Sequence, residues 1–110
     1  MGLLSSLART EVAVPLAPAQ ASVRLVQVLS EHGFALDDAS HAGGTELGFE
    51  SPLQGFRNAL TGAARITANG SGSLVELTLD VAPGQSYAVL DGRRNRSTLA
   101  QIVAALPEQE

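Results

Sequence analysis

The chain has 110 residues, of which 45% are hydrophobic and 16% charged, with a net charge of −4 and no cysteine. This balance argues against a disordered chain or a membrane span, and it predicts one soluble domain over residues 1–110 with flexible ends at 1–8 and 107–110. Few aromatic residues and a negative charge count against nucleic-acid binding. The lack of cysteine, with a short interrupted apolar N-terminus, indicates a bacterial-type cytoplasmic protein.

The first predicted elements are a strand and a helix. Apolar residues alternate over residues 9–16, which predicts a half-buried strand closed by prolines. Pro18 suits the first turn of a helix that runs to His32 with one broad apolar face. Gly33 then supplies the left-handed residue that ends the helix, and Phe34 folds back on its last turn.

A hairpin and a connector are expected next. Short alternating runs at residues 34–40 and 45–50 flank a double glycine, which predicts two antiparallel strands. Ser51 suits an N-cap, Pro52 suits the first turn, and Gly62 suits the position after the last turn. The segment from Ser51 to Gly62 is therefore predicted to be a short amphipathic helix. A covering loop with one helical turn is the alternative for this segment.

A second hairpin is predicted from residues 63–68 and 74–81, which flank a Gly/Ser-rich turn. In its second strand the apolar residues alternate strictly with polar ones, so one face belongs to the core and the other to solvent. The core-facing residues are Val75, Leu77, Leu79 and Val81; the solvent-facing residues are Glu76, Thr78 and Asp80.

The last predicted element is a helix before Pro107. Thr98 and Gln101 have capping-box spacing, so the helix begins at Ser97, or near Ser86 if it is longer. Tyr87–Leu90 could instead form another strand. A long helix would place on one stripe Ala88, Gly92, Asn95, Leu99, Ile102 and Leu106.

The predicted order is β-α-β-β-β-β-α, which gives an α+β two-layer sandwich with a curved antiparallel sheet and two main helices on one face. At the level of fold, this order resembles the half-repeat of TATA-binding-protein-like domains and the small helix-grip ligand-binding folds. The TATA-binding-type arrangement fits the length better. The resemblance concerns shape and implies no particular function.

Two groups of residues are candidates for chemistry. The first could in principle hold a metal, but we interpret it as a helix-end histidine beside a polar hairpin, with no metal or cofactor; it comprises Glu31, His32, Asp37, Asp38 and His41. The second is Arg93, Arg94 and Arg96, just before the predicted helix, where guanidiniums could bind a phosphate or carboxylate. Our first interpretation of these arginines is a solvated loop.

The sequence contains no nucleophile elbow, P-loop, zinc motif or dinucleotide fingerprint, so we expect a protein that is not an enzyme. The leading hypothesis is a binding or interaction module that uses its sheet face or an edge strand to form a homodimer or to meet a protein partner. The alternative is a helix-grip-like carrier that holds a small apolar or acidic ligand between the sheet and the last helix. Arg93, Arg94 or Arg96 would then meet the acidic group.

Overall fold

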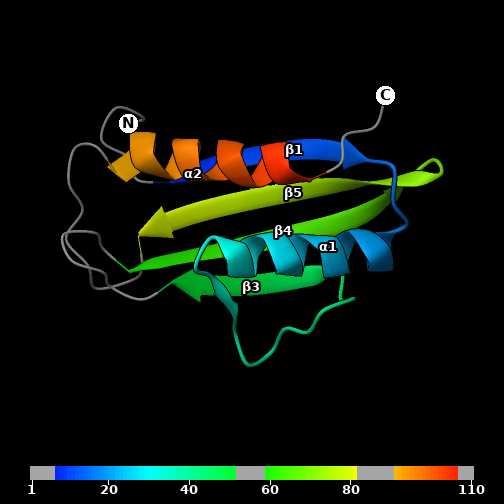
Figure 1. Ribbon diagram of the computed structural model, residues 1–110, viewed down its shortest axis with the longest axis horizontal. Coiled ribbons are helices and arrows are strands. Elements are labelled where there is room, and N and C mark those ends of the chain that lie inside the picture. Colours follow the sequence, from blue (N-terminus) through cyan, green and yellow to red (C-terminus); the bar gives the residue numbers. More distant parts are fainter. Residues whose placement is uncertain (1–6, 52–58, 82–90, 107–110) are drawn as a thin grey trace.

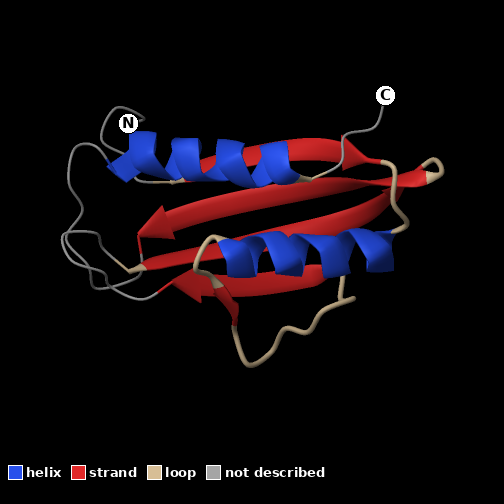
Figure 2. Cartoon of the chain, in the orientation of Figure 1, coloured by secondary structure: helices blue, strands red, loops and turns tan. Residues whose placement is uncertain are grey.

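The structure is a computed structural model that describes residues 7–51, 59–81 and 91–106. Its elements are, in chain order, β1 (Ala8–Val14), α1 (Pro18–Glu31), β2 (Ala35–Leu36), β3 (Glu46–Ser51), β4 (Leu60–Asn69), β5 (Gly72–Val81) and α2 (Asp91–Ala105). Figures 1 and 2 show the strands as one sheet with both helices on the same face of it. The predicted α+β class and element order are therefore confirmed.

The five strands form one antiparallel sheet in the order β1-β5-β4-β3-β2. Because side chains alternate between the two faces of a sheet, directly opposed residues share a face and line up in rows that cross the strands. We call the face beneath the helices the inner face and the opposite one the outer face. One inner row, for example, joins Ala8 of β1, Leu79 of β5 and Gly62 of β4.

The core lies between the inner face and the two helices. α2 packs on β1 and β5, whereas α1 packs on β4 and β5, so the helices divide the inner face between them (Figure 1). Neither helix, within the residues described, is long and apolar enough to cross a membrane. The largest buried side chains come from both layers: Leu25, Val28, Leu29, Phe49, Val75, Leu77, Leu79, Leu99 and Ile102.

The end of α1 follows the predicted pattern. Gly33 has a φ of 85°, and the Phe34 N–H donates a hydrogen bond to the carbonyl of Leu29 at 2.9 Å. The Gly33 N–H bonds the carbonyl of Ser30, which completes a Schellman motif. His32 adds a contact of 2.9 Å between its Nδ1 and the carbonyl of Val28. These bonds satisfy carbonyls that a helix end otherwise leaves without a partner.

Two buried serines fasten connections to the core. The Ser73 Oγ donates to the carbonyl of Leu16 at 2.6 Å, so the start of β5 is tied to the link between β1 and α1. The Ser22 Oγ accepts a hydrogen bond from the Gly43 N–H at 3.0 Å, which ties α1 to the β2–β3 loop. Both serines are fully buried, and both hydroxyls are satisfied.

The predicted start of β4 was wrong. The strand begins at Leu60, so Leu60 and Gly62 belong to the sheet and do not end a short helix. Gly62 is required by packing, because a Cβ there would meet the ring of Phe49 and lie 2.6 Å from the carbonyl oxygen of Thr78. The rest of the predicted helix or covering loop, residues 52–58, lies outside the described residues.

Three other boundaries also differ from the prediction. α2 is already helical at Asp91, so the predicted start at Ser97 was wrong and the longer of the two predicted helices agrees with the structure. The Thr98 Oγ1 donates to the carbonyl of Arg94 inside this helix. β2 is only two residues long, because the chain turns at Asp37. β1 includes Ala8, which was expected in a flexible end. The expected ends at 1–6 and 107–110, and the Tyr87–Leu90 segment, lie outside the described residues.

Candidate functional site

The outer face of the sheet carries a groove that crosses the strands. Its floor is the row Gly48, Ala63 and Thr78, whose side chains are absent or small. Two open hollows of about 690 Å³ and about 410 Å³ lie along this floor, and both are lined by Glu76 and Thr78. The smaller hollow ends at Arg9, which is directly opposite Thr78 in the register. We call these two hollows together the outer-face groove.

Charged rows border the outer-face groove on both sides. Carboxylates outnumber guanidiniums in these rows, so the groove is negatively charged although Arg9 and Arg65 belong to it. The only ion pair that the described residues show here joins Arg65 to Glu46 at 3.6 Å, and both side chains are mostly exposed. One border is Glu11, Glu76, Arg65 and Glu46, and the other is Asp80, Thr61 and Glu50.

A fixed carboxylate closes the β3 end of this groove. Asp37 accepts hydrogen bonds at Oδ1 from the Ala39 N–H at 3.1 Å and from the Ser40 hydroxyl at 2.7 Å. Ser40 in turn accepts the Gly48 N–H at 2.7 Å, and the Asp37 N–H bonds the Gly48 carbonyl. Since a Cβ on Gly48 would run into Oδ2 of Asp37, this carboxylate lies directly on the groove floor.

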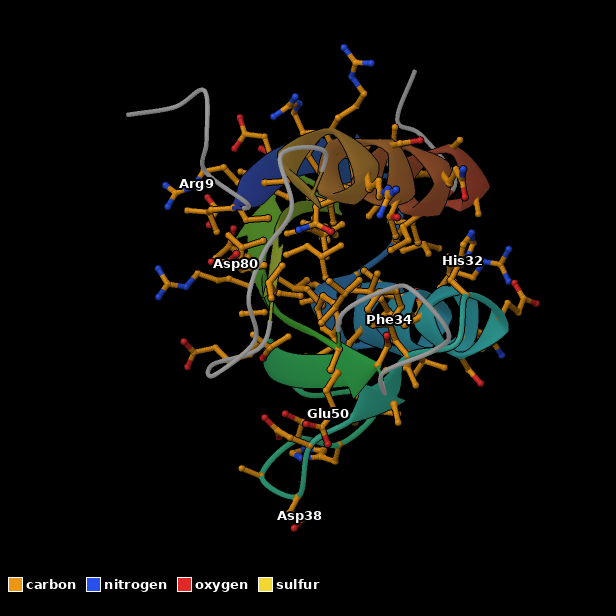
Figure 3. All side chains as sticks on the ribbon, turned by 90° about the vertical axis from the view of Figure 1, so that its left-hand side faces the viewer. Arg9, His32, Phe34, Asp38, Glu50 and Asp80 are labelled. Atoms are coloured by element: carbon orange, nitrogen blue, oxygen red, sulfur yellow. The ribbon has the colours of Figure 1, made fainter. Side chains whose placement is uncertain are left out.

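A second candidate region lies on the inner face, where β5 ends and β4 begins. Leu60 is half-buried there, opposite Val81, and the rings of Phe34 and Phe49 form a T-shaped pair with centroids 5.4 Å apart. Figure 3 looks onto this end and shows Phe34 on the helix side of the sheet, whereas Arg9 and Asp80 lie on the other side. The first turns of α2 lie over the same end (Figure 1) and bring in Asn95, which is only 2% exposed.

The three candidate arginines lie within the first two turns of α2 and not in a loop before it. All three are exposed. With about 100° per residue, Arg93 is about 160° from the direction of Asn95, while Arg94 and Arg96 lie about 100° to either side. The structure therefore does not bring the three guanidiniums together on the inner side of the helix. Their role in anion binding stays a prediction.

The residues considered for a metal are spread over different structures. His32 lies at the end of α1, where its ring contacts the Val28 carbonyl, and Asp38 lies at the tip of the β2–β3 loop (Figure 3). Asp37 is bound to the loop backbone as described above, and His41 is exposed. Within the described part of the chain, no group of three or more potential ligands could hold a metal ion.

Two features of these regions were not predicted from the sequence. The polar face of β5 was assigned to solvent, but Glu76 and Thr78 were not placed in a groove, because a groove needs the register of four strands. Asn95 was expected in a stripe with Leu99, but the burial of its amide was not predicted. The helical spacing of Asn95, Leu99, Ile102 and Leu106 was the available signal, and all four are buried.

Comparison with known proteins places the fold. No family model matches the sequence, and no curated protein matches it. Among solved structures, Ara h 8.0201 aligns with a TM-score of 0.55 and 11% identity over 90% of this chain and 92% of its own. The protein CV1439 from Chromobacterium violaceum aligns with a TM-score of 0.53 and 10% identity over 94% of this chain and 99% of its own.

Two further neighbours come from biosynthetic loci. DynU16, from the dynemicin biosynthetic locus, has a TM-score of 0.61, and the di-domain ARO/CYC StfQ, from the steffimycin pathway, has 0.52. The chain spans about half of each, 46% and 50% respectively. Their identities of 10% and 12% show likeness of fold alone. These neighbours have helix-grip folds, so of the two resemblances noted in the sequence the helix-grip one is supported.

Proposed function

We propose that this chain is a small-molecule-binding module of helix-grip type, whose ligand lies on the inner face beneath the first half of α2. The proposal rests on which residues lie on the inner face where β5 ends and β4 begins. Half-buried aliphatic surface at Leu60 and the Phe34–Phe49 pair lie at the same end as one buried amide, Asn95. Mostly apolar surface with few polar groups is the usual make-up of a ligand site.

The same residues favour a neutral ligand. Among the described residues the buried polar side chains are Ser22, Ser73 and Asn95, and no charged side chain is buried. An ionised group on the inner face would therefore lack a charged partner, which is strongly unfavourable in a dry site. An apolar molecule with a hydroxyl or carbonyl group fits this surface. An acidic group would have to lie at the rim of α2, where Arg94 or Arg96 could reach it.

A pair of fluorescent probes separates these ligand classes. N-phenyl-1-naphthylamine is neutral and apolar, whereas 8-anilinonaphthalene-1-sulfonate carries the same rings with a sulfonate. We expect the neutral probe to bind the wild-type protein and Leu60→Trp to abolish this binding by filling the site. Thr67→Trp, at an exposed position on the same strand, is the matched control and should bind normally. Equal binding by both tryptophan variants would refute the location.

The arginine hypothesis is tested with the same probes. If Arg94 and Arg96 meet an acidic group, Arg94→Ala/Arg96→Ala weakens binding of the sulfonated probe and leaves the neutral probe unaffected. Arg93→Ala is the matched control, because Arg93 points away from the inner side of α2. Unchanged binding of the sulfonated probe in the double variant would remove the arginines from the site.

The expectation that the chain is not an enzyme is not supported by the comparisons, because the neighbours include the di-domain ARO/CYC StfQ from a biosynthetic pathway. We retain binding as the proposed function for a chemical reason. A general acid or base in the proposed site would have to face the inner surface, and the described inner surface offers only an amide and hydroxyls. Turnover of a bound molecule by the purified protein would overturn this part of the proposal.

A further inference from the structure

The exposed side of α2 has a regular pattern of small and basic residues. Ser97, Ala100 and Ala104 are exposed and lie within about 60° of one another around the helix axis, so they form a ridge of small residues, which Arg93 continues at its N-terminal end. Arg96 lies on one flank of this ridge and Arg94 on the other, each about 80° from Ala104. We call this surface the α2 ridge.

The outer-face groove has the complementary pattern. Its floor of Gly48, Ala63 and Thr78 is shallow, and its borders carry Glu46 and Glu76 on one side and Glu50 and Asp80 on the other. A helix with this pattern would place Ser97, Ala100 and Ala104 on this floor and the guanidiniums of Arg94 and Arg96 against the two borders, with Arg93 beyond the end of the floor. The match is therefore one of shape and of charge.

The dimensions also agree. Four residues separate Glu76 from Asp80 on β5, so the borders are about 13 Å apart, which accommodates a helix about 10–12 Å in diameter. The floor crosses from β3 to β5, about 10 Å in all, with Arg9 beyond it on β1, and α2 with its 15 residues is about 22 Å long. A helix lying across the strands would thus cover the whole floor.

We propose that the α2 ridge of one copy of this chain docks in the outer-face groove of a second copy. The two surfaces lie on opposite sides of the sheet, because α2 covers the inner face (Figure 2). The contact is therefore heterologous: each copy offers one ridge and one groove, and association continues into chains of copies. This proposal does not require the ligand site to exist, although Arg94 and Arg96 take part in both.

Electrostatics within a single copy supports the same pairing. Three guanidiniums in the first two turns of α2 lie at the positive end of the helix dipole, which is unfavourable. On the sheet, Glu76 has Arg65 opposite it on β4 and Glu11 opposite it on β1, and the like charges of Glu11 and Glu76 are destabilising in this relation. Carboxylates of a neighbouring groove would offset the first repulsion, and arginines of a neighbouring ridge would offset the second.

Two variants test the contact, since each should remove one surface and leave the other. Arg94→Glu/Arg96→Glu reverses the charge of the ridge, and Ala63→Arg fills the groove floor with a bulky cation. Both change exposed positions, and thermal unfolding followed by circular dichroism verifies that both fold. Ser30→Arg, on the exposed side of α1, is the matched control for an added positive charge.

The readout is sedimentation velocity with native mass spectrometry over a range of protein concentrations at low salt. We expect the wild type and Ser30→Arg to form a series of species beyond the dimer, which shortens as salt is raised. Each surface variant alone should associate at least about tenfold more weakly. An equimolar mixture of the two should give a 1:1 heterodimer and nothing larger, because only one intact ridge can meet one intact groove.

Several results would overturn the proposal. A wild-type protein that stays monomeric at every concentration would do so, as would one that stops at a dimer, because a closed pair requires a symmetric contact. Failure of the mixed variants to form a heterodimer would also refute it. So would association of either variant alone at the wild-type strength.

Discussion

Replacing Gly62 by Ala tests how tightly the inner face is packed beside the proposed ligand site. A Cβ at this position would lie within 2.5 Å of ring atoms of Phe49 and 2.6 Å from the Thr78 carbonyl oxygen. The ring can turn, but the carbonyl belongs to the β4–β5 ladder and cannot move without breaking the register. Forcing an extra carbon into such a place typically costs about 1–3 kcal/mol.

A smaller loss of conformational entropy offsets part of this destabilisation. Alanine loses less conformational freedom than glycine when a strand forms, which favours the variant by about 0.5–1 kcal/mol. The middle of these ranges gives a net destabilisation for Gly62→Ala of about 1.2 kcal/mol, or a fall in Tm of roughly 5–10 °C for a chain of this size. Ala63→Ser, one residue along on the exposed outer face, should change Tm by less than about 2 °C.

Urea unfolding followed by circular dichroism measures both variants, and a double-mutant cycle with Phe49→Leu identifies the clash. If the Phe49 ring is the main obstacle, the double variant will be more stable than the sum of the single effects predicts, by about 0.5 kcal/mol or more. A neutral or stabilising Gly62→Ala, or strictly additive effects, would show that the ring and the carbonyl can move apart and that this end is loosely packed.

Three further changes have clear expected effects. Ser73→Ala removes the buried hydrogen bond to the Leu16 carbonyl and should lower the free energy of unfolding, measured by urea titration, by about 1–3 kcal/mol. An unchanged urea midpoint would mean that this bond adds nothing to stability. Gly33→Ala places a side chain at a φ of 85° and should cost about 1–2 kcal/mol, visible as a lower Tm; no loss would mean that the helix end relaxes without strain. Arg93→Glu should stabilise the dilute protein by about 0.3–1 kcal/mol at low salt and less at high salt, and a decrease would contradict the dipole argument.

Local patterns were sufficient for much of the fold. α1 was predicted from Pro18 to His32 and spans Pro18–Glu31, because its start and its end are both encoded by nearby residues. The alternation in β5 was also correct, with Val75, Leu77 and Leu79 buried and Glu76 exposed. These elements depend on residues that are close in sequence, so periodicity alone identifies them.

The errors arose where a local signal had a tertiary cause. Gly62 resembles the end of a helix in sequence, but it is a glycine because the ring of Phe49, from another strand, occupies the space of its side chain. Thr98 and Gln101 have the spacing of a capping box, but the helix already exists there and Thr98 bonds the carbonyl of Arg94. The preference for a TATA-binding-type arrangement rested on the length of the chain, whereas the structural neighbours have helix-grip folds.

The candidate sites were the least accessible to sequence analysis. Arg93, Arg94 and Arg96 were noticed because they are close in sequence, yet the helix turns them to different sides. The outer-face groove needs residues of four strands in register, and no single segment contains its pattern. Neither the directions of the three arginines nor the outer-face groove could therefore be predicted from one stretch of the sequence.

The hydrogen bond from Arg24 to the Ala105 carbonyl has a consequence for how α2 opens. It fastens the last turn of α2 to α1 with a charged donor at the negative end of the helix, while the first turns hold arginines at the positive end. Local unfolding should therefore start at the arginine-rich turns and stop near Ile102. In hydrogen exchange, amides of the last turn should be protected longer than those of residues 95–98. The part of α2 over the proposed site would then unfold locally while its last turn stays bound to Arg24.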